Sequence, residues 1–145
     1  MLERLDYFKI APRRILDAGS GPGREAKALA ARYRAAQLVA LDFSLPILCR
    51  ARGWFSFLSR RHAVCADLSR LPLAAESIDF VWSNMALHWS DDPAAVLGEF
   101  RRVLAADGLV MFSTLGPDTL KELRAAAGVG RVHAFVDMHD IGDML

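Results

Sequence analysis

The sequence predicts a doubly wound α/β domain in which parallel strands alternate with helices. Three observations support this prediction. Short apolar runs without polar alternation recur along the chain, as is typical of strands covered on both faces. Segments with apolar residues at helical spacing separate these runs. A glycine-rich turn joins the first apolar run to the first helical segment, as in parallel βαβ units.

Residues 14–17 form the first predicted strand, which ends at Asp17. The sequence Gly19-Ser20-Gly21-Pro22-Gly23 follows, and this density of glycine and proline indicates a turn. From residue 24 to residue 34, apolar residues recur at i, i+3, i+4 and i+7, which predicts one buried face of a helix. These residues are Ala26, Leu29, Ala30 and Tyr33.

Residues 38–42 form the second predicted strand and end at Asp42. We expect Ser44 to cap the next helix, which carries a proline in its first turn. One face of that helix is expected to comprise Leu45, Leu48 and Cys49. Residues 63–66 form a third strand, followed by Asp67, and residues 78–83 form a fourth.

Asp91-Asp92-Pro93 predicts the start of a helix, because a capping acid precedes proline at the first helical position. Its buried face should comprise Val96, Leu97, Phe100, Val103 and Leu104, and Asp107-Gly108 should end it. Residues 109–114 form the fifth predicted strand. Thr119 and Glu122 fit a capping box for a helix that runs to Gly128. Residues 137–145 are expected to begin another helix, and residues 1–10 to end an earlier one.

Length and composition indicate one globular domain over residues 1–145. The 53% hydrophobic and 24% charged residues exclude a disordered chain. A net charge of +1 gives no general reason to expect a nucleic-acid partner. No apolar run approaches the length of a membrane span, and the charged N-terminus is unlike a signal peptide. Cys49 and Cys65 are expected to be buried thiols, so the chain is predicted to be cytoplasmic.

The segment Asp17 to Gly23 closes a strand and opens a helix, where α/β sheets bind ligands. Glycine leaves no side chain between the backbone and a ligand, so we interpret the segment as a ligand-contact loop. A phosphate loop would need a lysine followed by a hydroxyl residue, and neither is present. A dinucleotide fingerprint would need glycine where Arg24 stands.

The pattern D-x-G-x-G-x-G resembles the first motif of class I S-adenosylmethionine-dependent methyltransferases, which have a Rossmann-like fold. The resemblance implies that Asp17, Gly19, Gly21 and Gly23 shape the site for the methionine part of S-adenosylmethionine. It implies that Asp42, beside Phe43, binds the ribose. Further cofactor-binding residues implied in the same way are Asp67, Leu68 and Asn84.

Two stretches, residues 83–93 and 112–123, resemble the biotin-synthesis methyltransferases more closely. That group methylates the free carboxyl of a malonyl thioester on acyl carrier protein, so the resemblance implies this activity and this partner. The same stretches also resemble a sister group, the methyltransferase-like assembly factors of respiratory complex I, one of which hydroxylates an arginine. A cofactor-binding module without turnover and a nicotinamide-dependent enzyme stay open as further alternatives.

His88 and Trp89 follow the fourth strand and are candidate substrate contacts, although Trp89 could instead pack under the next helix. No catalytic residue is assigned, because a carboxylate acceptor is already anionic and needs no general base. His133, His139, Asp137 and Asp140 match no zinc pattern, so no metal is expected.

Arginines at positions 50, 52, 60 and 61 could contact an acidic carrier protein or form a solvated surface. Complete members of the resembled family end their sheet with an antiparallel hairpin, for which this sequence has no pattern. We therefore expect the chain to be a truncated domain with an open sheet edge.

Overall fold

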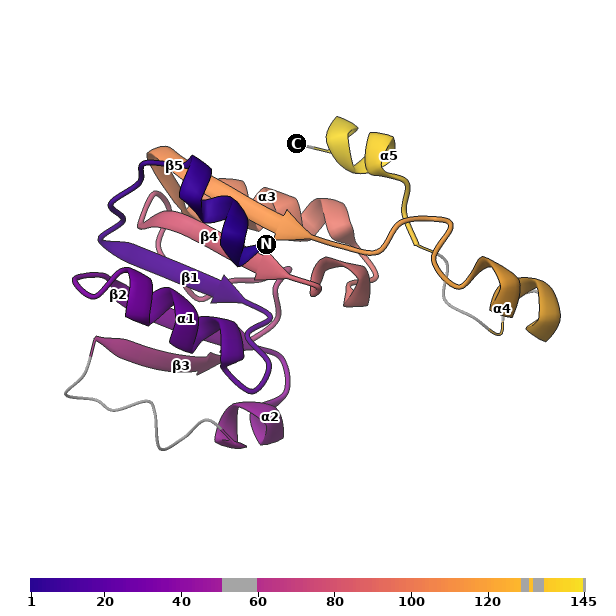
Figure 1. Cartoon of the computed structure of the whole chain (residues 1–145), viewed down its shortest axis with the longest axis horizontal. Helices are drawn as coiled ribbons and strands as arrows, with labels where there is room; N and C mark the ends of the chain where they lie inside the picture. The colour runs from indigo at the N-terminus through magenta and orange to yellow at the C-terminus, as the bar shows by residue number, and fades with distance from the viewer. Residues whose placement is uncertain (51–59, 129–130, 132–134, 145) are drawn as a thin grey trace.

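The computed structural model describes residues 1–50, 60–128, 131 and 135–144. Five parallel strands form one sheet in the order β3-β2-β1-β4-β5 (Figure 1). The predicted sheet of five parallel strands is therefore confirmed. The strands are β1 (Arg14–Ala18), β2 (Gln37–Asp42), β3 (Arg61–Cys65), β4 (Ile78–Asn84) and β5 (Leu104–Ser113).

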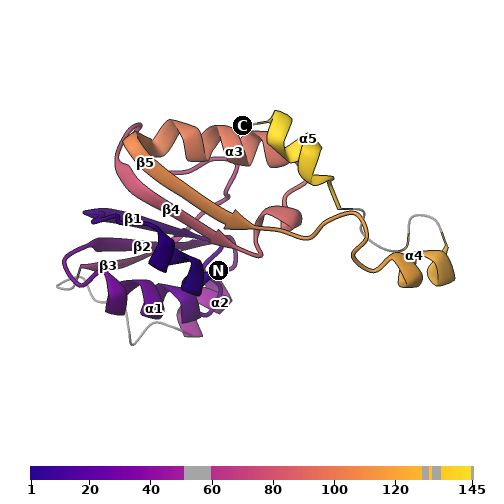
Figure 2. The ribbon, with the colours of Figure 1, turned by 45° about the horizontal axis from the view of Figure 1, so that its top comes forward.

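Helices cover both faces of the sheet, with α1 and the 3-10 helix η1 on one face and α3 and α5 on the other (Figure 2). Helix α4 stands away from the sheet (Figure 1) and buries no side chain. The helical elements are η1 (Leu2–Tyr7), α1 (Arg24–Arg32), α2 (Leu45–Arg50), η3 (Leu87–Trp89), α3 (Pro93–Val103), α4 (Lys121–Ala127) and α5 (Met138–Asp143).

The central strand β1 contributes to two hydrophobic cores because successive side chains of a strand point to opposite faces. Ile15 packs in the core that contains Leu29 of α1, whereas Leu16 packs in the core that contains Phe100 of α3. All these side chains are fully or almost fully buried. With both faces covered by helices, the carboxyl ends of the strands are left to form a site.

Helix α3 begins as predicted, with Asp92 as the N-cap and Pro93 in the first turn. The expected end at Asp107-Gly108 is wrong, because α3 ends at Val103 and β5 follows directly from Leu104. The register shifts between the pairs Ile78–Leu104 and Phe80–Leu109, so the strand carries an irregularity that includes Asp107 at φ 62°. The aspartate-glycine pair thus bends a strand instead of ending a helix.

Replacing Asp92 with alanine should lower the free energy of unfolding by about 1 kcal/mol, a typical value for a lost N-cap. Asp92 Oδ1 accepts a hydrogen bond from the backbone N–H of Ala95 at 3.0 Å. Urea unfolding followed by circular dichroism measures the loss. Asp91→Ala is the matched control, because Asp91 is exposed and does not cap α3. Equal losses in the two variants would contradict the capping role.

Three local predictions are wrong. Cys49 and Cys65 are exposed thiols, because α2 buries only Leu48 and β3 lies at the edge of the sheet. Leu45, expected on the buried face of α2, is also exposed. The capping box at Thr119 does not form: the N-cap of α4 is Leu120, in a left-handed conformation without a side-chain cap. The predicted end of α4 at Gly128 is confirmed.

Candidate functional site

A cavity of about 530 Å³ opens at the carboxyl ends of β1, β2 and β4. Strand β1 lies between β2 and β4, so the chain reverses its direction of winding beside β1. Such a switch point is where open α/β sheets bind ligands. The cavity is lined by Gly19, Gly21, Asp42, Phe43, Ile47, Leu68, Met85, Ala86 and Trp89.

The turn after β1 is held against β2 by its backbone. The N–H groups of Gly19 and Ser20 both donate to the carbonyl of Leu41, at 2.8 and 3.0 Å. Gly19 and Gly21 have φ angles of 78° and 54°, which favour glycine. A Cβ at Gly19 would overlap the Cβ of Ala86, whereas one at Gly21 would have no neighbour within 4 Å in the described part of the chain. Both the backbone conformation and the packing against Ala86 therefore favour glycine at position 19.

Asp42 connects the glycine turn to the start of α2. Its Oδ2 accepts from the N–H of Gly21 and its Oδ1 from the N–H of Ser44, both at 2.8 Å. Each carboxylate oxygen can accept a second hydrogen bond, so Asp42 can still receive hydroxyl groups of a ligand. Asp42 therefore shapes both the glycine turn and the start of α2.

Asp17 lies buried below the same turn. Burial, together with the negative charges of Glu25 and Asp42, raises the pKa of its carboxyl to about 8. Its Oδ2 has no hydrogen-bond partner in the described part of the chain. A buried acid in this state is protonated at neutral pH, and a cation bound beside it would favour the ionised form.

A second cavity, of about 420 Å³, adjoins the first and shares Phe43, Leu68, Ala86 and Trp89 with it. It extends to Asp67, whose Oδ1 accepts from both the N–H and the hydroxyl of Ser69 at 2.8 Å. These bonds lower the pKa of Asp67 and keep it ionised. We call the two cavities together the acidic groove. Its described lining includes four aspartates, Asp42, Asp67, Asp91 and Asp92, and neither lysine nor arginine.

Comparison of the sequence with models of known protein families shows which family has this sheet and groove. The family model of the methyltransferase domain matches residues 16–112, which extend from β1 to β5. The chain belongs to this methyltransferase family. The matched residues include the glycine turn and every aspartate of the acidic groove.

Two curated relatives of this methyltransferase domain are both named malonyl-[acyl-carrier protein] O-methyltransferase. The protein from Methylovorus sp. is 54% identical over the whole chain, which covers 52% of that protein. The protein from Gallionella capsiferriformans is 52% identical over the whole chain, which covers 53% of it. The chain thus spans about half the length of the curated relatives it matches.

A solved structure supports the fold of the methyltransferase domain. The S-adenosylmethionine-dependent methyltransferase from Mesorhizobium loti is 32% identical, with a TM-score of 0.63. The alignment covers 72% of this chain and 47% of that one.

The methyltransferase domain brings most of the sequence-predicted cofactor residues together. Three of them lie outside the lining of the acidic groove: Asp17, Gly23 and Asn84. Gly23 is the N-cap of α1, and Asp17 lies beneath the turn. The side-chain amide of Asn84 donates to Glu25 at 3.3 Å, and its Oδ1 accepts from the Ser113 hydroxyl at 2.7 Å. Asn84 therefore connects α1, β4 and β5 behind the groove.

The two substrate candidates of the methyltransferase domain line different cavities, although their ring centroids are only 5.3 Å apart. Trp89 does not pack under the next helix: it is 82% exposed and lines the groove together with the exposed Phe43. His88 is half-buried and packs against Phe135, with ring centroids 5.9 Å apart. It lines a separate small cavity with Thr114, outside the groove.

Sequence reasoning missed several residues of the acidic groove. Met85 and Ala86 follow the predicted fourth strand and line the first cavity, with Met85 in a left-handed conformation at φ 56°. Asp91 and Asp92 were interpreted only as a helix start, yet they line the second cavity. The other missed lining residues are Ile47, Ser69 and Ser90.

Two further observations concern the described residues alone. They contain no group of three or more histidine, cysteine or acidic side chains placed to hold a metal ion, and His133 lies outside them. None of their helices has the length and apolar character required to cross a bilayer.

Proposed function

We propose that this methyltransferase domain binds S-adenosylmethionine in the acidic groove and takes part in methylating the malonyl carboxyl of an acyl carrier protein thioester. The observation that carries the proposal is the groove itself: a glycine turn and four aspartates at the switch point of the sheet. The printed names of the curated relatives supply the acceptor.

The charge of the groove fits this donor. S-adenosylmethionine carries a positive sulfonium and a positive ammonium group, and the described lining offers carboxylates without a competing cation. Asp17, whose buried Oδ2 has no hydrogen-bond partner among the described residues, would stabilise the ammonium group near the glycine turn. Asp42 would accept hydrogen bonds from the ribose, and Asp67 with Leu68 would border the adenine.

When bound, S-adenosylmethionine supplies an electrophilic methyl group: a carboxylate oxygen forms a bond to the methyl carbon, the carbon–sulfur bond breaks, and S-adenosylhomocysteine leaves. The chain's own residues position the reactants and need not remove a proton, because the acceptor is already ionised. The four aspartates are distributed along the groove and would repel an anionic acceptor that approached along it. The malonyl carboxylate is therefore expected to approach near Gly19 and Met85, away from Asp67.

Isothermal titration calorimetry should detect S-adenosylmethionine binding to the purified chain with a dissociation constant in the micromolar range. Asp42→Asn should weaken binding at least about tenfold, because a charged acceptor of ribose hydroxyls is lost. Asp118→Asn is the matched control: this exposed residue lines neither cavity of the groove. Absence of binding to the folded wild-type chain would refute the proposal.

Mass spectrometry of malonyl-carrier protein incubated with the chain and S-adenosylmethionine tests the acceptor. Methyl transfer adds one methylene mass to the malonyl group. A gain of one oxygen on an arginine of a protein substrate would support the sister activity instead. Binding of S-adenosylmethionine without either product would make the chain a cofactor-binding module.

A further inference from the structure

The loop between β3 and β4 supplies residues 67–69 to the lining of the acidic groove. The first end of this loop is fixed by the sheet, because β3 ends at Cys65. The loop then makes a tight turn, in which the N–H of Arg70 donates to the carbonyl of Asp67 at 3.2 Å. The position of the turn therefore depends on what holds its far end, at Leu71.

Two side chains of α3 hold the loop at Leu71. The N–H of Leu71 donates to Glu99 Oε2 at 2.6 Å, and its carbonyl accepts from Arg102 Nη2 at 3.0 Å. Arg102 Nη1 also donates to the carbonyl of Leu73, at 2.9 Å. We call Glu99 and Arg102 the loop clamp. The clamp fixes the backbone on both sides of Leu71, whose side chain is buried in the core that contains residues of α3.

The two side chains of the loop clamp also bind each other. Arg102 Nε and Nη2 donate to Glu99 Oε1 and Oε2, at 2.6 and 2.8 Å, which makes a bidentate charged pair. The hydrogen bond from Arg102 lowers the pKa of Glu99 below its usual value, so the pair stays ionised at neutral pH. A planar guanidinium can serve both carboxylate oxygens and two backbone carbonyls at once, whereas the ammonium of lysine cannot.

The loop clamp lies outside the groove whose lining it supports. Neither Glu99 nor Arg102 is among the described residues that line the two cavities. Attachment of the loop at Leu71 nevertheless restricts the position of Asp67, at the start of the same turn. Both hydrogen bonds from Ser69 are made to Asp67 Oδ1, so Oδ2 can accept one from the amino group of a purine. Small displacements of that oxygen matter, because a hydrogen bond weakens steeply outside a narrow range of geometry.

We propose that the loop clamp positions Asp67 for the adenine of the methyl donor and thereby sets the preference of the groove for this base. The inference rests on the proposed function, which assigns the groove to S-adenosylmethionine. Glu99 and Arg102 are positioning residues, since they act through Asp67 and not on the donor itself. Loosening the clamp should cost selectivity at the adenine end of the groove and leave the glycine turn unchanged.

Calorimetry should compare S-adenosylmethionine with an analogue whose base is purine, which is adenine without its amino group. The wild type should bind the adenine compound at least about tenfold more tightly, because the analogue cannot make the hydrogen bond to a charged acceptor. Arg102→Lys and Glu99→Gln should each reduce this preference at least about threefold.

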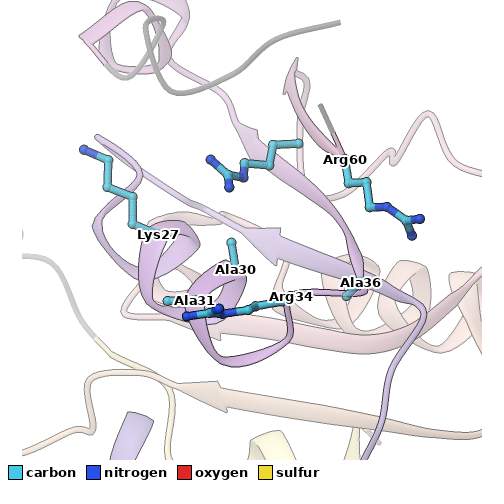
Figure 3. Close-up of a pocket in the computed structure, with 7 residues that line it drawn as sticks. Lys27, Ala30, Ala31, Arg34, Ala36 and Arg60 are labelled. Carbon is cyan, nitrogen blue, oxygen red and sulfur yellow. The ribbon is translucent and has the colours of Figure 1, made fainter. Parts of the chain in front are cut away.

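Arg34→Lys is the matched control for Arg102→Lys. Arg34 lines a hollow of about 510 Å³ between α1 and the start of β3 (Figure 3). Arg60 lines the same hollow and directly precedes β3, so the hollow lies at the amino end of this strand, away from the groove. Glu122→Gln, at an exposed position of α4, is the control for Glu99→Gln. Both controls should keep the preference for adenine within about twofold of the wild type.

A double-mutant cycle separates positioning from a general structural effect. Asp67→Asn should lower the preference by itself, and Arg102→Lys should change it no further in that background, because the clamp acts through Asp67. Equal changes in both backgrounds would overturn the inference, and so would an unchanged preference in the folded clamp variants. Circular dichroism checks the folding of each variant, and Glu99→Gln carries the test if Arg102→Lys does not fold. Loss of folding in both would assign the clamp to stability alone and overturn the inference as well.

The binding measurements also distinguish this inference from the proposed function. If the wild type binds S-adenosylmethionine but does not prefer it to the purine analogue, only the clamp inference fails. Absence of S-adenosylmethionine binding by the folded wild type would refute the proposed function, and the clamp inference would fall with it.

Discussion

Asp17→Asn is expected to stabilise the ligand-free protein at neutral and alkaline pH while weakening its binding of S-adenosylmethionine. Burial, with a contribution from the charges of Glu25 and Asp42, raises the pKa of the Asp17 carboxyl from 3.8 to about 8. The folded state therefore disfavours the ionised side chain. Asparagine has a similar shape and carries no charge, so it removes this cost.

The direction of the pH dependence follows from proton binding. Between pH 3.8 and about pH 8 the folded wild type retains a proton on Asp17 that the unfolded chain has released. The stability contribution of Asp17 therefore falls as pH rises through that window and levels off above it. Relative to the wild type, Asp17→Asn should gain on the order of 3 kcal/mol between about pH 5 and about pH 8.

Urea unfolding of both proteins across this pH range measures the gain, with Asp118→Asn as the exposed control. Parallel stability curves for the wild type and Asp17→Asn would show that Asp17 does not titrate in this range.

Calorimetry in buffers of different ionisation enthalpy tests the expected effect of Asp17 on the binding of S-adenosylmethionine. Wild-type binding of S-adenosylmethionine near pH 7 should release a proton from Asp17, whereas Asp17→Asn should release none from this site and bind at least about tenfold more weakly.

Gly19→Ala should cost on the order of 3 kcal/mol of stability and abolish measurable binding of S-adenosylmethionine. Two effects combine at this position. The backbone has a φ of 78°, which disfavours residues with a side chain, and the added Cβ would overlap the Cβ of Ala86. The turn must shift to relieve the overlap, and the shift would disturb the hydrogen bonds from Gly19 and Ser20 to Leu41.

Two companion variants separate the effects. Gly21→Ala carries only the backbone cost, because a Cβ there would have no neighbour within 4 Å among the described residues, so about 1–2 kcal/mol is expected. Ala86→Gly in the Gly19→Ala background removes the overlap and should restore part of the lost stability, giving a coupling energy between the two sites. Urea unfolding of the wild type, the three single variants Gly19→Ala, Gly21→Ala and Ala86→Gly, and the double variant measures these effects. Independent effects of Gly19→Ala and Ala86→Gly would contradict the close approach.

The sequence was informative wherever a local rule governs structure. Asp92 before Pro93 predicted the start of α3, because a capping side chain acts on N–H groups only a few residues away. Gly128 likewise predicted the end of α4. The strands and their order along the chain were predictable from continuous apolar runs, since burial on both faces leaves that pattern.

Local rules failed where contacts between distant segments decide the outcome. Asp107-Gly108 has the composition of a helix end but lies within β5, because the pairing of β5 with β4 extends past it. Cys65 is exposed because β3 is the edge strand of the sheet. The residues of β3 alone do not reveal the position of this strand in the sheet. Leu120 adopts a left-handed N-cap that no propensity would favour.

By itself, the sequence determined that a glycine turn and aspartates stand at the ends of successive parallel strands. Only the tertiary structure decided which of them share a cavity. It placed Asp42 and Trp89 in one groove, packed His88 against Phe135, and buried Asp17 with no partner for one oxygen among the described residues. The physical reason is that spacing along the chain orders the elements, whereas side-chain direction, burial and the charge of a surface arise from segments that meet only when the sheet is assembled.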